Sequence, residues 1–301
     1  MKNKPVYVEI PIEADMNKLW DATQSPDLHA RWDLRFSSIT YLPKKEESEP
    51  QHFKYKTNIG FGMSIEGFGK SAGEFHAGDG SRTSSLHFGT DQKRSLIREG
   101  RGYWKYKPNQ ENITFLTQYD YDVRFGKAGT FFDKMLFRPM IGWATALSFD
   151  VLRRWLVKGE APESQYLRFF SVWVISFLFF FVWTYHGAVP KLFFQHPEEI
   201  GMAEKLLEMP FKEAARLTAG IGIAEILFGC LWLFPLKKRW LFGIQLLAFP
   251  MLALSAALAD PGVLTHPFTP ITFNAALFVL SGIGFFQSRD VPSAKSCNRK
   301  R

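Results

Sequence analysis

The first half of the chain alternates between apolar and polar positions over short stretches, a pattern typical of β-strands. In VYVEIPIEA, four apolar side chains from Val6 to Ile12 fall on one face with a period of two. The same pattern, bounded by Gly, Pro, Asn or Asp, predicts further strands at Leu34–Leu42, His52–Ile59, Met63–Phe75, Arg82–Phe88, Ser95–Tyr106 and Ile113–Val123. Six or seven antiparallel strands with short connections predict a curved sheet.

Helical spacing appears at both ends of this strand region. Asp15 is a suitable N-cap for MNKLWDATQ, and Ser25 for PDLHARW. After the strands, apolar residues recur at helical spacing from Met140 to Leu152 within residues 129–160. One long helix after a series of strands can lie in the concave face of the sheet. We therefore expect an α+β domain over residues 1–160.

From Phe169 onward the apolar runs are long enough to cross a bilayer, about 20 residues each. They predict an all-α bundle of four transmembrane helices over residues 169–287, joined to the first domain by a tether at 161–168. A basic tail would follow at 288–301. The predicted helices are 169–189, 214–234, 240–259 and 268–287.

The basic residues beside these runs predict one orientation. Lys and Arg precede the first span, form LKKRW between spans two and three, and follow the fourth span. The loop at residues 260–267 has neither, and acidic residues outnumber basic ones in the loop after span one. Because positive loops stay in the cytosol, both termini should be cytosolic. A short amphipathic helix in EEIGMAEKLLEM should either lie on the outer membrane surface or cap the four-helix bundle.

Charge and cysteine content argue against nucleic-acid binding, a disulfide framework and a cysteine metal site. The 301-residue chain has a net charge of +8, but the basic residues cluster beside apolar runs, so they indicate topology and not nucleic-acid binding. Cys230 and Cys297 form no disulfide or metal spacing. The stretch MKNKPVYVEIPIEAD has no apolar h-region of a signal peptide, so the first domain is expected in the cytosol of a bacterial cell, bound to the plasma membrane.

Several polar residues fall inside or beside the predicted spans. Glu225 lies in the middle of the second span, and His186 and Lys191 at the outer end of the first. Glu225 is either a proton-handling or ligand-anchoring group, or a helix–helix hydrogen-bonding group that fixes packing. Gly220, Gly222 and Gly229 favour the packing reading, and Lys191 alone is typical of a side chain that extends to the interface.

The motifs WTYHGAVPKLFFQHPEE, GIAEILFG and HPFTPITFNAAL, in this order, resemble the DoxX-like family of small four-helix membrane proteins over about residues 166–287. The resemblance implies that a set of residues matches recurring positions: His186, Gly187, Pro190, Lys191, Glu199, Glu225, Pro270 and Asn274. With Tyr185, these polar residues are the membrane-site candidates. The wider group is associated with membrane redox complexes. Because the chain has no haem, iron–sulfur or Rossmann motif, no cofactor is evident, and a redox role would need a borrowed cofactor or a quinone.

The order of elements in residues 4–158, with VYVEIPIEAD and LWDATQSPDLHARW at its start, resembles the START/polyketide-cyclase-like superfamily, also called SRPBCC or helix-grip. The resemblance implies a cavity between the sheet and the long helix that holds a hydrophobic ligand. We call this predicted domain the cup. Aromatic residues near the expected cavity are its candidate ligand contacts: Trp32, Tyr103, Phe115, Tyr119, Tyr121 and Trp143.

No catalytic signature occurs in the cup. His29, His52, His76 and His87 lie in no nucleophile or metal spacing, so most should be solvated and no metal is expected. Alternation along a strand does not reveal which face is concave, so further lining residues stay open.

Three hypotheses of function remain. The first is a cytosolic cup that binds, senses or transfers a hydrophobic small molecule or lipid at the inner leaflet, with membrane lipids as further partners. The second is an enzyme, a membrane oxidoreductase component acting on a quinone through His186, Lys191 and Glu225. The third is a membrane anchor of a partner complex. A membrane-protein partner or a homo-oligomer stays open.

Overall fold

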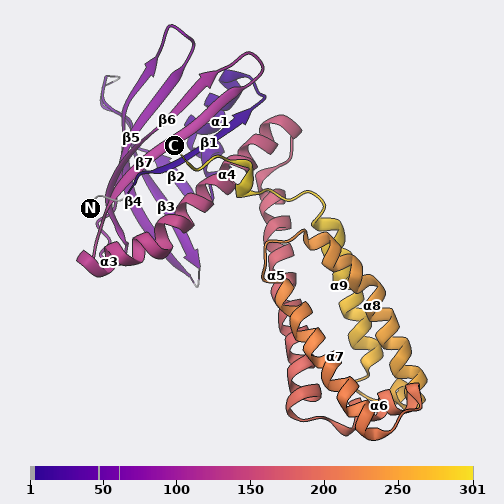
Figure 1. The fold of residues 1–301 in the computed structure, drawn as a ribbon. Coiled ribbons are helices and arrows are strands. Elements are labelled where there is room, and N and C mark those ends of the chain that lie inside the picture. The colour runs from indigo at the N-terminus through magenta and orange to yellow at the C-terminus, as the bar shows by residue number, and fades with distance from the viewer. Residues whose placement is uncertain (1–3, 47, 61, 301) are drawn as a thin grey trace. The chain divides into compact units, whose positions relative to one another are not determined.

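The computed structural model describes residues 4–46, 48–60 and 62–300. The chain divides into two compact units (Figure 1). The first unit is Met1–Tyr166 together with Pro292–Arg301, and the second is Leu167–Val291. Each unit has its own core and is described separately.

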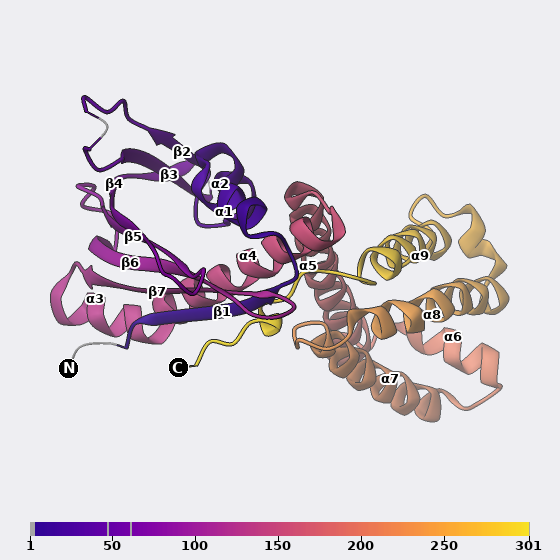
Figure 2. The same cartoon turned by 90° about the horizontal axis from the view of Figure 1, so that it is seen from above.

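The first unit contains an antiparallel sheet with the strand order β1-β7-β6-β5-β4-β3-β2. Its strands are β1 (Val6–Ile12), β2 (Ser38–Tyr41), β3 (His52–Gly60), β4 (Met63–His76), β5 (Arg82–Gly89), β6 (Ile97–Pro108) and β7 (Ile113–Val123). Figure 2 shows the curvature of the sheet and α4 (Arg138–Lys158) on its concave side. The predicted helix-grip fold is confirmed.

Local sequence explains the two short helices before β2. α1 (Met16–Gln24) begins after Asp15, whose carboxylate accepts from the backbone N–H groups of Asn17 and Lys18, as an N-cap does. α2 (Pro26–Trp32) follows Ser25, but the Ser25 side chain makes no capping hydrogen bond. Proline at the first helical position, with its fixed φ, starts this helix instead.

The predicted strand Leu34–Leu42 is shorter in the structure, since β2 begins only at Ser38. The carboxylate of Asp33 accepts from the backbone N–H of Arg35, and the hydroxyl of Thr57 donates to the Arg35 carbonyl. These bonds occupy backbone groups of the segment before β2 and hold it in a turn, which alternation alone does not reveal.

The long helix expected over 129–160 is divided into three parts. α3 (Gly126–Phe132) leads into a wide π-helical turn, η1 (Asp133–Phe137), and then α4. Asp133 has no solvent-exposed surface, and its carboxylate accepts from the Tyr121 hydroxyl at 2.7 Å and from Arg138 at 2.8 Å. This buried network holds η1 in place, and a single turn between α-helical segments is the usual form of π-helix.

The C-terminal residues pack on the first unit. Asn298 pairs with Glu9 through two backbone hydrogen bonds at the free edge of β1. Before it, the 3₁₀ turn η4 (Ala294–Ser296) follows Ser293, whose backbone N–H donates to Asp150 of α4 at 2.8 Å. Pairing at this edge covers backbone groups of an edge strand.

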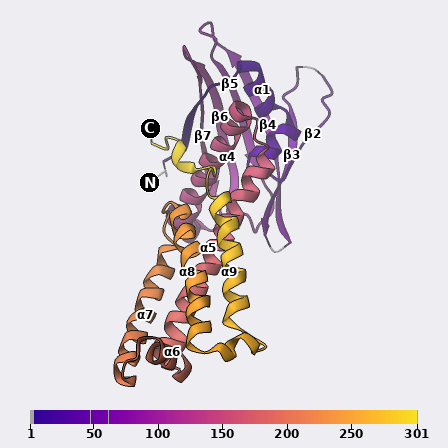
Figure 3. The same cartoon turned by 90° about the vertical axis from the view of Figure 1, so that its right-hand side faces the viewer.

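The second unit is helical (Figure 3). Its elements are α5 (Pro162–His186), η2 (Gly187–Phe193), α6 (Pro197–Leu207), α7 (Phe211–Leu231), α8 (Lys238–Ala259), η3 (Pro261–Thr265) and α9 (Pro270–Gln287), and the first five residues of α5 belong to the first unit. Within the described residues, four helices are long and apolar enough to cross a membrane: Pro162–Phe193, Phe211–Leu231, Lys238–Ala259 and Pro270–Gln287. Residues 162–168, expected as a tether, are already helical.

Large side chains fill the centre of the bundle. Phe179, Trp232 and Phe242 are fully buried and pack with Phe249. By contrast, many large apolar side chains on the outer faces are exposed, such as Leu247 at 71 %. An apolar surface of this extent is what a lipid environment requires and what water would oppose.

Candidate functional site

A large cavity lies in the first unit, with a volume of about 1550 Å³. Residues from α1, α2, the strands β2 to β7 and α4 line it. The sheet curves because its strands twist, and α4 covers the concave face only in part. We keep the name cup for this domain, residues 1–160, and call the space inside it the cup cavity.

The structure distributes the six predicted cup residues over two environments. Tyr103, Tyr119 and Trp143 line the cup cavity. Trp32 and Phe115 are fully buried and pack against each other with ring centroids 6.5 Å apart. Tyr121 is buried too, and its hydroxyl donates to Asp133.

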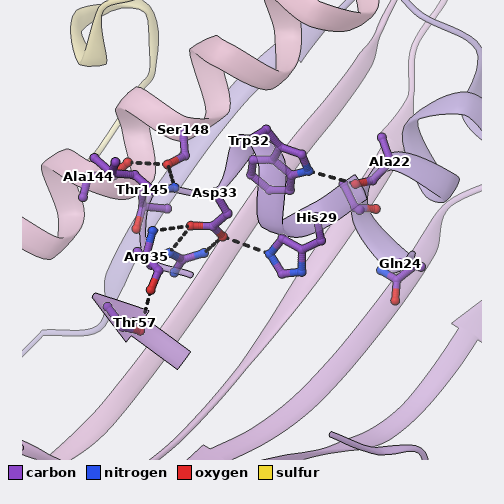
Figure 4. A network of polar contacts seen from close by, with 12 residues as sticks. Ala22, Gln24, His29, Trp32, Asp33, Arg35, Thr57, Ala144, Thr145 and Ser148 are labelled. Atoms are coloured by element: carbon purple, nitrogen blue, oxygen red, sulfur yellow. Dashed lines mark hydrogen bonds and ion pairs between the residues drawn. The ribbon is translucent and has the colours of Figure 1, made fainter. Parts of the chain in front are cut away.

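A charged network that the sequence did not reveal lies beside these rings. Figure 4 shows Asp33 between the imidazole of His29 and the guanidinium of Arg35. The Asp33 carboxylate accepts three hydrogen bonds: from His29 Nε2 at 3.0 Å, from Arg35 Nε at 2.9 Å and from Arg35 Nη2 at 2.6 Å. Its side chain is completely buried, whereas those of His29 and Arg35 retain 12 % and 15 % exposure. Both of these partners line the cup cavity.

Backbone contacts hold this network in place. The backbone N–H of Leu34 donates to Ser148 of α4 at 2.9 Å, and Trp32 Nε1 donates to the Ala22 carbonyl at 2.8 Å. His29 stacks on Trp32 and meets Phe36 and Trp104 edge-on, with ring centroids 4.8 to 5.2 Å apart. The imidazole therefore has a defined position in an aromatic corner of the cavity.

Burial and pairing set the charges here. Burial alone would raise the pKa of Asp33, but the charge and hydrogen bonds of Arg35, with His29, hold it well below its usual value. Asp33 is thus ionised at neutral pH. Burial lowers the pKa of His29 more than Asp33 raises it, so the imidazole is neutral at neutral pH. Three of the four histidines, His52, His76 and His87, are exposed as expected, whereas His29 is largely buried.

Sequence offered one signal for this network. His29 and Asp33 stand four residues apart at the end of α2, which is the spacing of side chains on one helix face. That spacing does not indicate which way the face points, and Arg35 lies in the turn beyond the helix. Only the packing of the turn on α4 and β3 brings the three side chains together.

The second unit contains a smaller cluster of charges. Lys191 Nζ lies 3.0 Å from Glu225 Oε2 of α7 and 3.4 Å from Glu199 Oε2 of α6. The side chains of Lys191 and Glu225 are 11 % and 10 % exposed. Three of the membrane-site candidates therefore come together, from three elements.

Helix geometry explains this juxtaposition. Lys191 follows Pro190 inside η2, a π-helical turn that changes the direction of side chains at the end of the first span. Gly187 of η2 and Gly222 of α7 approach so closely that a Cβ on Gly222 would stand 2.7 Å from the Gly187 carbonyl oxygen. Gly229 makes a similar approach to Thr184. Gly220 was expected to do the same, but among the described residues no atom of another element lies within 4 Å of a Cβ placed on it.

The other three membrane-site candidates are not part of the Lys191 cluster. His186 contacts the ring of Phe273 in α9, with centroids 5.4 Å apart. Asn274, next to Phe273, is half-buried near the start of α9. Tyr185 is 48 % exposed and points outward beside Phe181. Among the described residues no group of three His, Cys, Asp or Glu side chains could hold a metal ion.

Comparison with known proteins gives the relationships of both units. Residues 180–282 match the DoxX-like family. Over the N-terminal half, the chain resembles a STAR-related lipid transfer protein from Xanthomonas axonopodis, with 15% identity, a TM-score of 0.37 and coverage of 49% of this chain and 82% of that one. A START superfamily protein from Mycobacterium smegmatis has 11% identity and a TM-score of 0.34, over 46% of this chain and 91% of that one.

A full-length relative is the uncharacterized membrane protein YndG of Bacillus subtilis (strain 168). It is 39% identical over 304 positions, which cover 100% of this chain and 99% of YndG. Similarity across both units means that the two domains occur together in the relative as well. The chain is a membrane protein of the YndG family, in which a unit with the helix-grip fold precedes a helical unit whose residues 180–282 match the DoxX-like family.

Proposed function

We propose that the cup binds, senses or transfers a hydrophobic small molecule or lipid at the inner leaflet of the cell membrane. The cup cavity carries this proposal. At about 1550 Å³ it is larger than the roughly 300–1,000 Å³ of most small-molecule sites. Apolar side chains such as Leu86, Phe88 and Ile141 line it together with many polar ones, and apolar atoms make up most of its surface, as is usual for a pocket that holds an apolar ligand.

The membrane domain supports the same function, because it holds the cup close to a ligand that is concentrated in the lipid. The basic residues flanking the spans favour cytosolic termini, so the cup would face the inner leaflet. A ligand that partitions into lipid and a cup attached to the same bilayer share a small volume, which raises the effective concentration of each for the other.

Mass spectrometry of molecules that co-purify with the full-length protein in nanodiscs tests this function. Ala144→Trp places a large ring in the cup cavity, because Ala144 lines it from α4. Ala128→Trp, at an exposed position of α3, is the matched control. We expect an apolar molecule with wild type and with the control, and its loss from Ala144→Trp.

The same bound molecule in all three proteins at equal amounts would contradict the proposal, because it would then bind outside the cavity. A folded wild type without any bound apolar molecule beyond the nanodisc lipids would also count against it. Circular dichroism confirms that each variant is folded before the comparison is made.

A second candidate is a membrane redox component that acts on a quinone. The contacts of Lys191 with Glu199 and Glu225 favour it, since a buried ammonium between two carboxylates could donate to a substrate carbonyl and move a proton. Glu225→Gln tests this role against packing. Loss of quinone reduction by a fully folded protein would support proton chemistry, whereas loss of the folded bundle would indicate a packing role.

A further inference from the structure

The imidazole of His29 has one occupied nitrogen and one available nitrogen. Nε2 lies 3.0 Å from the ionised Asp33 carboxylate, which accepts a hydrogen bond, so Nε2 carries the ring proton. Nδ1 of the neutral ring is then an acceptor. Among the described residues, no hydrogen-bond partner of Nδ1 occurs.

The neighbouring charges decide which ligand group fits this acceptor. Asp33 and Arg35 form a two-pronged ion pair and neutralise each other. A ligand carboxylate would therefore meet the lone pair of Nδ1 with no uncompensated positive charge beside it. A hydroxyl group, in contrast, can donate directly to Nδ1.

The rings near His29 indicate the shape of the molecule that carries this hydroxyl. Phe36 and Trp104 meet the imidazole edge-on, and both line the cup cavity. Tyr55 packs on Phe36 with ring centroids 5.4 Å apart and lines the cavity too. Offset and edge-on contacts with these rings favour a flat aromatic ligand over a flexible chain.

We propose that the cup cavity holds a flat, apolar aromatic molecule by its phenolic hydroxyl, which donates to Nδ1 of His29. The Asp33 carboxylate on the far side of the ring fixes the tautomer and strengthens Nδ1 as an acceptor. This inference rests on the proposed function and specifies the class of ligand.

Two probes of the same shape test it: 2-naphthol, which has the hydroxyl, and 2-methoxynaphthalene, which lacks the donor. Titration calorimetry measures both on full-length wild type, His29→Phe and His52→Phe in identical nanodiscs. Phe keeps the ring contacts of His29 but removes Nδ1, and His52 is an exposed histidine that does not line the cup cavity. Partition into lipid is the same for each protein and cancels in the comparison.

We expect wild type and His52→Phe to bind 2-naphthol about 10-fold more tightly than 2-methoxynaphthalene, about the worth of one good hydrogen bond. In His29→Phe the two probes should bind equally, with the affinity for 2-methoxynaphthalene unchanged. His29→Gln, which retains an acceptor, should recover part of the preference and guards against a folding defect in His29→Phe.

Other outcomes separate the two proposals. Equal binding of both probes by wild type, or an unchanged naphthol preference in His29→Phe, overturns the role of His29 but leaves the cavity as the binding site. Binding of both probes that Ala144→Trp does not reduce overturns the proposed function, and this inference with it.

Discussion

Asp33 carries a negative charge at a position where its side chain has no contact with solvent. Such a charge is tolerated only because His29 and Arg35 donate to both carboxylate oxygens. Tyr119 adds to this corner, since Arg35 lies over its ring at 5.4 Å and its hydroxyl shares a hydrogen bond with Thr145. The positions of His29 and Arg35 in the wall of the cup cavity therefore depend on the Asp33 carboxylate.

Replacing Asp33 by Asn should destabilise the first unit by about 3–5 kcal/mol, because it leaves the half-buried Arg35 charge without its partner. Asp27→Asn, at an exposed position in the first turn of α2, should cost less than about 1 kcal/mol. Urea unfolding followed by tryptophan fluorescence measures both. Equal effects of the two substitutions would show that the ion pair contributes little.

The His29 pKa predicts how stability depends on pH. Its folded pKa lies below the ordinary 6.5, so the unfolded state binds more protons as pH falls below about 6.5. The His29 contribution is therefore complete above pH 6.5 and is lost on acidification toward the folded pKa. The charges that face the ring are those of Asp33 and Arg35, and neither titrates in this range.

Between pH 7 and pH 5, wild type should lose more unfolding free energy than His29→Phe, because only the wild type has this histidine to protonate. Urea midpoints at several pH values give the comparison. Parallel pH profiles for the two proteins would mean that His29 protonates equally easily in the folded and unfolded states.

At the scale of elements, the wide turn η2 and the close approach of α7 together create the membrane cluster. Two glycines permit this approach, since any side chain on Gly222 would meet the Gly187 carbonyl and the Cβ of Lys191 at less than 3.0 Å. Small residues are a common means of helix association in membranes.

Gly222→Val should therefore destabilise the bundle, by about 1–3 kcal/mol for an overpacked contact. Gly220→Val, on the same helix, should have little effect, because in the described part of the chain no atom of another element lies within 4 Å of the new Cβ. Thermal unfolding in detergent, followed by the loss of monodisperse protein, distinguishes them. If the Gly220→Val protein were as unstable as the Gly222→Val protein, the lost stability would come from the change in helix propensity and not from the contact of α7 with η2.

Sequence patterns predicted the elements better than the site. Alternation in β1 and the cap at Asp15 are encoded locally, and the length of the apolar runs predicted the four apolar helices. The helix-grip fold was implied by the resemblance that the order of these elements carries. The His29–Asp33–Arg35 network and the two π-helical turns depend on residues far apart in the chain, such as Ser148 and Asp133. Local periodicity contains no information on those contacts.

At the scale of the whole molecule, one membrane protein combines a unit with the helix-grip fold and a helical unit whose residues 180–282 match the DoxX-like family. The C-terminal residues, expected to be a basic cytosolic tail, pack on the first unit through Asn298 and Ser293. The first unit thus includes residues from the N-terminal part and from the C-terminal part of the chain. The proposed topology has both termini in the cytosol.

Cysteine labelling tests that topology. In a Cys230→Ala, Cys297→Ser background, Thr265→Cys lies at an exposed position of the loop between α8 and α9, and Ser296→Cys at an exposed position near the C-terminus. An impermeant maleimide should label Thr265→Cys in intact cells and Ser296→Cys only after permeabilisation. The reverse pattern would place the cup outside the cell and would rule out an inner-leaflet role.

Photo-crosslinking inside the cup cavity tests the central claim most directly. Tyr103, which lines the cavity, is replaced by p-benzoylphenylalanine in cells, and exposed Phe75, which does not line it, is replaced in the matched control. After irradiation, mass spectrometry of the full-length protein should find an apolar small-molecule adduct at position 103 and none at position 75. A position 103 without any such adduct, or the same adduct at both positions, would contradict a ligand held in the cup.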